Sequence, residues 1–336
     1  MGGSLNSLDR DRILITGGSG FVGSAVIEKL KEHGYSSCFA PTHQQYDLNR
    51  EDHVQRIYED IKPTVVIHCA GKVGGVAANI KAPGQFFYDN IRMNIFTTHY
   101  AYLNKVKKFV ALLPGCSYPD NPPSSPHFKE EDYWAGFPEK SSYAYSLARK
   151  MLAIQNMAYN QEYGFKAVNL IPSNLYGLRD NFSLQDAHVV PALVRKFIEA
   201  VDQKKDSVPL WGTGKASRDF LYIEDCAEDV VSALEKVEDP EPINIGAGFY
   251  YTIREMAEKL ADITGFKGEL KWDTSKPEGQ SHRAYDLSRQ EQFLGIRKRT
   301  GLEEGLRKTV QWYRENQFSS TIRKGDAIPR HVTAHA

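Results

Sequence analysis

The feature that most constrains the fold is the alternation of short apolar runs with longer amphipathic stretches. Four runs rich in aliphatic and β-branched residues predict buried strands, at residues 13–16, 64–70, 108–113 and 167–171. Helical patterns lie between them, at residues 21–33, 86–104 and 142–163. Strands that alternate with helices predict an α/β protein built on a doubly wound parallel sheet.

A glycine-rich turn follows the first strand, and its glycines have the spacing GxxGxxG from Gly17 to Gly23. Glycine lets the backbone turn tightly and approach a pyrophosphate, whose charge then meets a helix N-terminus. By itself this could be a plain turn, but its place in the first strand–helix unit predicts a Rossmann-type NAD(P) site. We expect cofactor contacts from the residues of this turn: Gly17, Ser19, Gly20, Phe21, Val22 and Gly23.

The residues leave the choice between NADP and NAD open. An NAD site usually has an acidic residue at the end of the second strand, and an NADP site has an arginine there. This region, residues 39–44, has neither. Thr42 and His43 could reach a 2′-phosphate, and Asp47 would suit the adenine end of the cofactor.

Two segments depart from the alternation. Residues 114–142 are rich in proline and aromatic residues and predict a long irregular loop, which leaves a strand end where ligands bind in such sheets. Beyond residue 177 the elements become mixed and shorter, which indicates a smaller mixed α/β lobe. We therefore expect residues 1–177 to bind mainly NAD(P) and residues 178–322 to bind mainly the substrate, although the chain is free to cross between these two parts. Residues 323–336 are expected to form a disordered tail.

Composition argues against several classes of protein. Lys plus Arg and Asp plus Glu both number 42, so the chain has no basic field for nucleic acid or an anionic membrane. No apolar run reaches the ~18–20 residues that would span a bilayer. The four cysteines are far apart, which gives no reason to expect a metal ion or a disulfide framework. We expect a cytoplasmic protein.

Tyr145 and Arg149 are four residues apart on a predicted helix, so they share one face. Tyr-x-x-x-Lys is the catalytic pair of short-chain dehydrogenases, in which lysine lowers the pKa of the tyrosine and holds the ribose. Here arginine stands in the lysine position. Lys150 cannot simply replace it, because it lies about 140° around the helix from Tyr145.

Taken together, these stretches resemble the extended short-chain dehydrogenase/reductases, and most closely the GDP-L-fucose synthase family. These enzymes are GDP-4-keto-6-deoxy-D-mannose 3,5-epimerase-4-reductases. The resemblance extends from Ile13 to about Asn316. The motifs that carry it are Lys72-Val73-Gly74-Gly75 with Asn79, Cys116-Ser117-Tyr118-Pro119, residues 172–177, Asp180-Asn181-Phe182, residues 188–193, Trp211-Gly212-Thr213-Gly214 and Lys276-Pro277-Glu278-Gly279.

The resemblance implies the following chemistry. Cys116 would be the base and His188 the acid of epimerisation at carbons 3 and 5, and both residue types can exchange protons near neutral pH. Tyr145 would protonate the keto oxygen while NADPH reduces carbon 4, and NADP(H) is favoured with NAD(H) not excluded. Further cofactor contacts would come from Ala70, Gly71, Arg149, Pro172, Asn174, Leu175 and His188. The GDP-sugar would contact Asn174, Lys196, Trp211, Arg218, Glu278 and Arg283.

The chain departs from this family at two positions. Pro114 stands where the family has a serine that hydrogen-bonds the keto oxygen, and Arg149 stands where it has lysine. Losing such a donor typically costs a few kcal/mol of transition-state stabilisation. An epimerase with weak or no reduction, and a non-catalytic dinucleotide-binding protein, therefore stay open as alternatives. The family also implies a homodimer packed through the helices at 86–104 and 142–163.

Overall fold

The computed structural model describes residues 11–120, 122–124, 126–183, 187–276 and 281–316. It confirms the predicted fold class, because the main sheet has six strands that all pair in parallel, in the order β10-β6-β4-β3-β1-β2. These strands are β1 (Ile13–Thr16), β2 (Cys38–Phe39), β3 (Val65–His68), β4 (Lys108–Leu112), β6 (Ala167–Pro172) and β10 (Ile243–Ile245).

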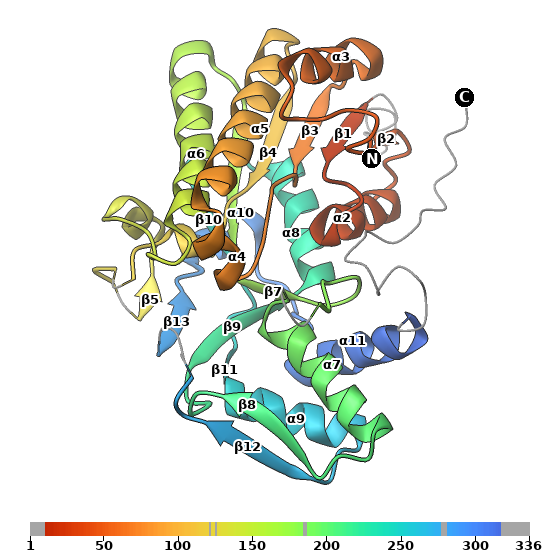
Figure 1. The fold of residues 1–336 in the computed structure, drawn as a ribbon. Helices are drawn as coiled ribbons and strands as arrows, with labels where there is room; N and C mark the ends of the chain where they lie inside the picture. Colours follow the sequence, from red (N-terminus) through yellow and green to blue (C-terminus); the bar gives the residue numbers. More distant parts are fainter. Residues whose placement is uncertain (1–10, 121, 125, 184–186, 277–280, 317–336) are drawn as a thin grey trace.

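Helices cover both faces of this sheet, as Figure 1 shows. One face carries α2 (Phe21–Glu32) and α8 (Ile223–Lys236), which pack against each other. The other face carries α3 (Glu51–Ile61), α5 (Pro83–Leu103) and α6 (Tyr143–Tyr163), and the short α4 (Val76–Lys81) precedes α5. Strands buried on both sides are expected to be continuously apolar, which explains why their runs stand out in the sequence.

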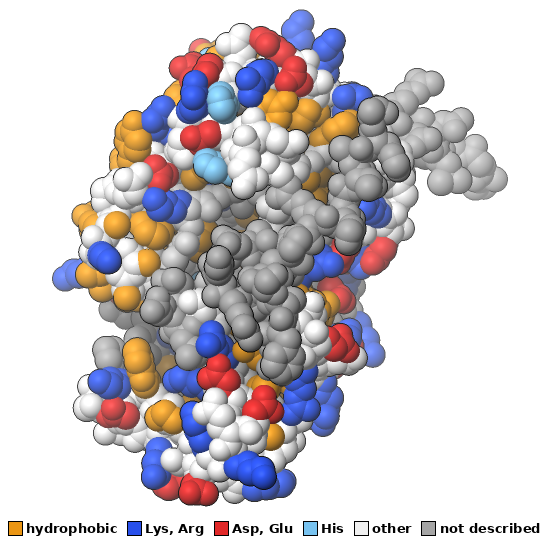
Figure 2. Space-filling model, turned by 45° about the vertical axis from the view of Figure 1, so that its right-hand side comes forward, with side chains coloured by type: hydrophobic (Ala, Val, Ile, Leu, Met, Phe, Trp, Pro, Cys, Tyr) orange, Lys and Arg blue, Asp and Glu red, His pale blue; other side chains and the backbone are white. Residues whose placement is uncertain are grey.

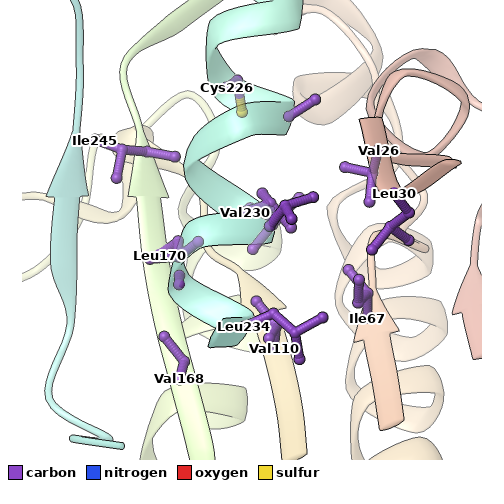
Figure 3. Close-up of a cluster of buried hydrophobic side chains, with 14 of the residues drawn as sticks. Val26, Leu30, Ile67, Val110, Val168, Leu170, Cys226, Val230, Leu234 and Ile245 are labelled. Carbon is purple, nitrogen blue, oxygen red and sulfur yellow. The ribbon is translucent and has the colours of Figure 1, made fainter. Parts of the chain in front are cut away.

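Figure 3 shows the core between the sheet and the α2–α8 layer. Val26 and Leu30 of α2 and Val230 of α8 point toward side chains of the strands, among them Ile67 and Val110. Their spacing along the helices is that of a single apolar face. This packing fixes where the N-terminus of α2, and with it the glycine-rich turn, meets the sheet.

The second part of the molecule is built on two smaller sheets. One has the order β11-β9-β13-β5, with β7 also paired to β9, and the other pairs β12 with β8. The strands are β5 (His127–Phe128), β7 (Asn174–Tyr176), β8 (Ser207–Trp211), β9 (Ser217–Tyr222), β11 (Tyr250–Thr252), β12 (Glu269–Asp273) and β13 (His282–Tyr285). The helices are α7 (Val189–Asp202), α9 (Ile253–Thr264) and α11 (Leu302–Asn316), whereas α10 (Ser288–Leu294) contacts α8 and β10.

The chain crosses between the two parts. Strand β10 and helix α8 return to the first part, and β5 and β7 pair with strands of the second. The division at residue 177 therefore stays a prediction, and the predicted tail at 323–336 lies outside the described residues.

The segment 114–142 is only partly irregular. It contains β5 and the 3₁₀ helices η1 (Gly115–Ser117) and η2 (Glu130–Trp134). Tyr118, Phe128 and Tyr133 are almost fully buried and pack against one another and the core. These aromatic side chains, the pairing of β5 with β13 and hydrogen bonds of Tyr118 and Glu130 with Asn244 hold the segment against the end of the sheet.

The surface agrees with the balanced composition. On the face drawn in Figure 2, basic and acidic side chains are interspersed, with no continuous basic field. Within the described ranges, no helix is long and apolar enough to cross a membrane.

Candidate functional site

The glycine-rich turn is shaped by close backbone approaches. Gly17 has φ +67°, and a Cβ there would lie 2.8 Å from the backbone of Ala70 after β3. A Cβ on Gly23 would lie 2.3 Å from the Gly17 carbonyl oxygen. Gly20, by contrast, is exposed at the N-cap of α2, and a Cβ there would meet only the Gly17 oxygen, at 3.2 Å. Gly20 is therefore less crowded than Gly17 and Gly23, and its exposed side is accessible to a ligand.

The other residues predicted for the turn are placed differently. The side chains of Phe21 and Val22 pack against the hydrophobic core. A phosphate could therefore contact these two residues only through their backbone amides at the start of α2. Ser19 is partly exposed.

The predicted adenine end of the site lies after β2. The Thr42 hydroxyl accepts a hydrogen bond from the Gln45 amide at 3.2 Å. His43 is largely exposed, and its ring lies 3.6 Å from the Asp47 carboxylate. None of the three is held rigidly toward the glycine-rich turn by these contacts.

Arg149 is buried and joins the ends of two neighbouring strands. One terminal nitrogen donates to the Ala70 carbonyl at 2.9 Å and to the Asn94 side-chain oxygen at 3.0 Å. The other donates to the Leu112 carbonyl at the end of β4. A planar guanidinium can reach several acceptors at once, which a single ammonium group does less well.

A buried histidine completes this network. The His68 ring lies 2.8 Å from the Thr16 hydroxyl through Nδ1 and 3.1 Å from Asn94 through Nε2. Burial, together with the positive charge of Arg149, lowers the pKa of His68 to about 3. The ring is therefore neutral at physiological pH. Its Nε2–H donates to Asn94, and Nδ1 accepts from Thr16.

Tyr145 lies one turn before Arg149 on α6. Burial raises the pKa of its phenol to about 12; Arg149 opposes this rise and Cys116 adds to it. Ser146, the next residue on α6, lies 3.3 Å from the Cys116 sulfur, so Cys116 contacts the helix directly beside Tyr145. At neutral pH Tyr145 is protonated and can donate a proton.

Cys116 lies in η1 and is partly exposed. Its sulfur is 3.3 Å from the Ser146 hydroxyl, which lies 3.2 Å from the Cys116 carbonyl. Ser117 donates to the backbone oxygen of Ser146, and Ser141 donates to Glu139. Both hydroxyl hydrogens thus have partners within the protein.

His188 is the N-cap residue of α7, and its side chain is exposed. The surrounding protein nevertheless desolvates the imidazole and lowers its pKa. Within the described part of the chain no hydrogen bond joins His188 to Cys116 or Tyr145, so its pairing with Cys116 stays a prediction.

Two arginines lie side by side in the second part of the molecule. Arg218 on β9 is directly opposite Arg283 on β13, and Arg283 is 3.3 Å from the Glu139 carboxylate. Burial and the charge of Arg283 lower the pKa of Arg218. Like charges opposite each other destabilise a sheet. An anion bound between them would relieve this repulsion.

The remaining predicted residues are spread around these centres. Trp211 is 63% exposed, and the half-buried Lys196 ammonium lies 5.9 Å from its ring. Asn174 begins β7, beside Leu175, and Pro172 ends β6. A Cβ on Gly71 would lie 3.5 Å from Arg149. Glu278 lies outside the described residues.

Comparison with known proteins gives the family. The model of the NAD dependent epimerase/dehydratase family matches residues 13–246. The chain belongs to this family. GDP-L-fucose synthase 1 of Arabidopsis thaliana is 37% identical over 306 residues, which cover 91% of this chain and 94% of that protein.

Similar solved structures agree with this assignment. A GDP-6-OMe-4-keto-L-xylo-heptose reductase from C. jejuni has a TM-score of 0.85 and 30% identity, over 94% of this chain and 100% of that one. A GDP-L-fucose synthetase from Naegleria fowleri bound to NADP has a TM-score of 0.85 and 29% identity, over 93% and 96%. The resemblance stated from the motifs is thereby confirmed.

Sequence reasoning missed several residues that surround the site. Ser146, His68 and Glu139 contact Cys116, Arg149 and Arg283, either directly or through one side chain. Ser146 and Glu139 make these contacts with residues that are distant along the chain. The only local signal was the place of Ser146 directly after Tyr145.

Proposed function

We propose that this protein is an NADPH-dependent epimerase/reductase of a GDP-linked 4-keto-6-deoxy sugar. The observation that carries the proposal is that Cys116, which contacts α6 beside Tyr145, and Arg149 lie at the carboxyl end of the parallel sheet, where the glycine-rich turn also lies. Its relatives include GDP-L-fucose synthases and a GDP-sugar reductase.

The residues present fit NADP(H). The open side of Gly20 and the first amides of α2 would receive the pyrophosphate. NADPH would supply the hydride for carbon 4, and a family member of known structure binds NADP. Thr42 and His43 would lie near the 2′-phosphate, as expected from the sequence.

Epimerisation would use Cys116 as the base and His188 as the acid. The keto group at carbon 4 acidifies the protons on carbons 3 and 5. Cys116 would remove such a proton from one face while His188 supplies one to the other. The lowered pKa of His188 means that its proton is released readily once it is protonated.

Reduction would use Tyr145 as the proton donor. Its raised pKa keeps the proton on the phenol until charge develops on the keto oxygen. The charge of the buried Arg149 lies close enough to stabilise the phenolate that remains.

The GDP diphosphate would be held by Arg218 and Arg283, since the repulsion between these cations favours a bound anion. Trp211 would offer its exposed face to the sugar or base, with the Lys196 ammonium 5.9 Å from its ring. Asn174 and Glu278 would also contact the GDP-sugar, as the family resemblance implies. The chain would act as a cytoplasmic homodimer, for which the outer faces of α5 and α6 supply the apolar surface.

One observation favours a second candidate function, epimerisation with little or no reduction. Pro114 has no side-chain donor for the keto oxygen, and the Ser117 and Ser141 hydroxyls have other partners. Both candidates share Cys116 and differ only in whether Tyr145 works.

The test measures both steps on the same substrate. GDP-4-keto-6-deoxymannose is incubated with NADPH in deuterated water, and reduced-nicotinamide absorbance and deuterium at carbons 3 and 5 are followed. We expect both NADPH loss and deuterium uptake in the wild type, and no deuterium uptake in Cys116→Ala. Deuterium uptake without NADPH loss would support the second candidate, and neither signal with any 4-keto nucleotide sugar would contradict both.

A further inference from the structure

Ser146 is fully buried on α6 and connects Cys116 with the helix N-terminus. Its hydroxyl oxygen lies 3.3 Å from the Cys116 sulfur, 3.2 Å from the Cys116 carbonyl oxygen and 3.3 Å from the Ser142 hydroxyl. Ser142 is the N-cap residue and is partly exposed. The side chains of Cys116, Ser146 and Ser142 thus form a chain of hydrogen-bond contacts that leads from the sulfur toward solvent.

The protonation state of Cys116 determines which hydroxyls in this chain of contacts donate and which accept. A serine hydroxyl has one proton to donate and two lone pairs that accept. While Cys116 is a thiol, Ser146 donates to the Cys116 carbonyl and accepts from the S–H and from Ser142. A thiolate only accepts. When Cys116 loses its proton, the Ser146 hydrogen can therefore turn to the sulfur, and Ser142 can still donate.

Other ionisable groups also act on Cys116. They are Tyr133 of η2, Tyr145 of α6, and Arg283 and Tyr285 of β13. Burial raises the pKa of all three tyrosines, so each keeps its own proton near neutral pH. Arg283 is a cation that cannot accept a proton. Among the described residues, the hydrogen-bond contact to the Cys116 sulfur comes from the Ser146 hydroxyl, so the path of the thiol proton begins there.

We propose that Ser146 is a positioning residue for Cys116: it donates to the thiolate and, with Ser142, passes the thiol proton to solvent. The relay rests on the proposed function. In that function, Cys116 becomes a thiol each time it removes a proton from carbon 3 or carbon 5. It must lose this proton and return to the thiolate before it can act again; we call this step the reset. In the reset, the Cys116 S–H bond breaks and a new O–H bond forms on Ser146. For this transfer the two hydroxyls first reorient, so that Ser146 donates to Ser142 and Ser142 donates to water. The former Ser146 proton then moves to Ser142, and a Ser142 proton passes to water.

The first test measures Cys116 without substrate. The rate of its alkylation by iodoacetamide is followed against pH in the whole protein, and peptide mapping separates Cys116 from the other cysteines. Ser146→Ala should slow alkylation about tenfold near neutral pH and move the midpoint up by about one pH unit. Ser146→Thr, which keeps a hydroxyl, should restore much of the rate.

Ser117→Ala is the matched control. Ser117 is a buried neighbour that donates to the Ser146 backbone oxygen and not to the sulfur. This variant should therefore keep the wild-type midpoint. An unchanged midpoint in Ser146→Ala, or an equal shift in Ser117→Ala, would overturn the proposal.

The relay has its own measurement. During turnover in deuterated water, Ser142→Ala should accumulate product labelled at one carbon, because the reset of Cys116 becomes slow. Wild-type labelling in Ser142→Ala would overturn the relay. Failure of the alkylation test overturns the role of Ser146 alone, whereas wild-type deuterium uptake in Cys116→Ala would overturn the base assignment of the proposed function.

Discussion

Single residues decide how Tyr145 is tuned. The Arg149 guanidinium donates its hydrogen bonds to the carbonyls of Ala70 and Leu112. Its effect on the pKa of Tyr145 therefore comes through its charge. Burial outweighs that charge and leaves the phenol with a pKa of about 12. The protein therefore holds Tyr145 in its proton-donating form.

This raised pKa predicts opposite pH behaviour for the two directions of the redox step. Reduction needs the phenol and should show no Tyr145-dependent loss of rate as the pH rises from neutral toward 9. Oxidation of the product by NADP needs the phenolate and should rise roughly tenfold per pH unit over this range. Rates in both directions at saturating substrate would check this.

Two variants serve as controls for the pH dependence of the redox rates. Tyr145→Phe should abolish both directions but leave deuterium uptake at carbons 3 and 5. Arg149→Met removes a positive charge and should raise the pKa of Tyr145 further. An oxidation rate that is flat with pH would contradict the proposed role of the phenolate.

At the scale of elements, the turn between β1 and α2 combines two kinds of glycine. Gly17 and Gly23 are required by the backbone around them, whereas Gly20 has space beside it. Packing within the chain therefore constrains Gly20 less than Gly17 and Gly23, and a bound pyrophosphate would add to the constraint.

Gly20→Ala should weaken NADPH binding by about tenfold or more, ~1.4 kcal/mol, because the methyl group enters the space beside the turn. The thermal unfolding temperature should fall only modestly, since the Cβ would lie 3.2 Å from the Gly17 backbone oxygen and needs a shift of a few tenths of an ångström. Gly84→Ala is the control, because a Cβ there meets nothing within 4 Å. Wild-type affinity in a folded Gly20→Ala protein would contradict the phosphate site.

The end of β3 makes a second prediction, for stability against pH. The unfolded His68 imidazole takes up a proton below about pH 6.5, but in the folded protein its pKa is about 3. Between these values the unfolded state binds more protons. The folded protein should therefore lose stability as the pH falls through this window, by up to ~1.4 kcal/mol per pH unit from His68.

Urea unfolding at pH 7 and pH 5 would measure this dependence. His68→Asn should be less stable than the wild type at pH 7, because the contacts to Thr16 and Asn94 are altered. Its further loss of stability at pH 5 should be smaller than that of the wild type. An equal loss in both proteins would show that His68 is not the group responsible.

For the whole molecule, the long buried strands, the helices beside them and the glycine-rich turn could be predicted from sequence, because their signals are local. Strand β5 could not, since its two residues are held by pairing with distant β13. The same limit applies to the site. Tyr145 and Arg149 are related by one helical turn, but the carbonyl partners of Arg149 and the contact of Ser146 with Cys116 arise only from tertiary packing.

The outer faces of α5 and α6 are unusually apolar for a surface. Large hydrophobic side chains more than 40% exposed recur on both helices: Phe87, Tyr88, Ile95, Leu103, Tyr143, Met151, Ile154 and Tyr163. Contiguous apolar patches of this kind mark interaction surfaces. The two helices also pack against each other, so together they form one continuous surface against which a second copy of the chain could pack.

We therefore expect a homodimer that a charge on this surface disrupts. Ile154 is 42% exposed on α6, and Ile154→Glu should shift the protein toward monomer in sedimentation equilibrium, because the carboxylate would be buried without a partner. Ile296→Glu is the control: Ile296 is 84% exposed and follows α10, which packs on α8 and β10, and its neighbour Arg297 bonds to α8, so this variant should keep the wild-type association. The folded monomer should retain NADPH binding, since the glycine-rich turn belongs to one chain. A wild-type protein that sediments as a monomer at all concentrations, or a loss of association in Ile296→Glu as large as in Ile154→Glu, would contradict this interface.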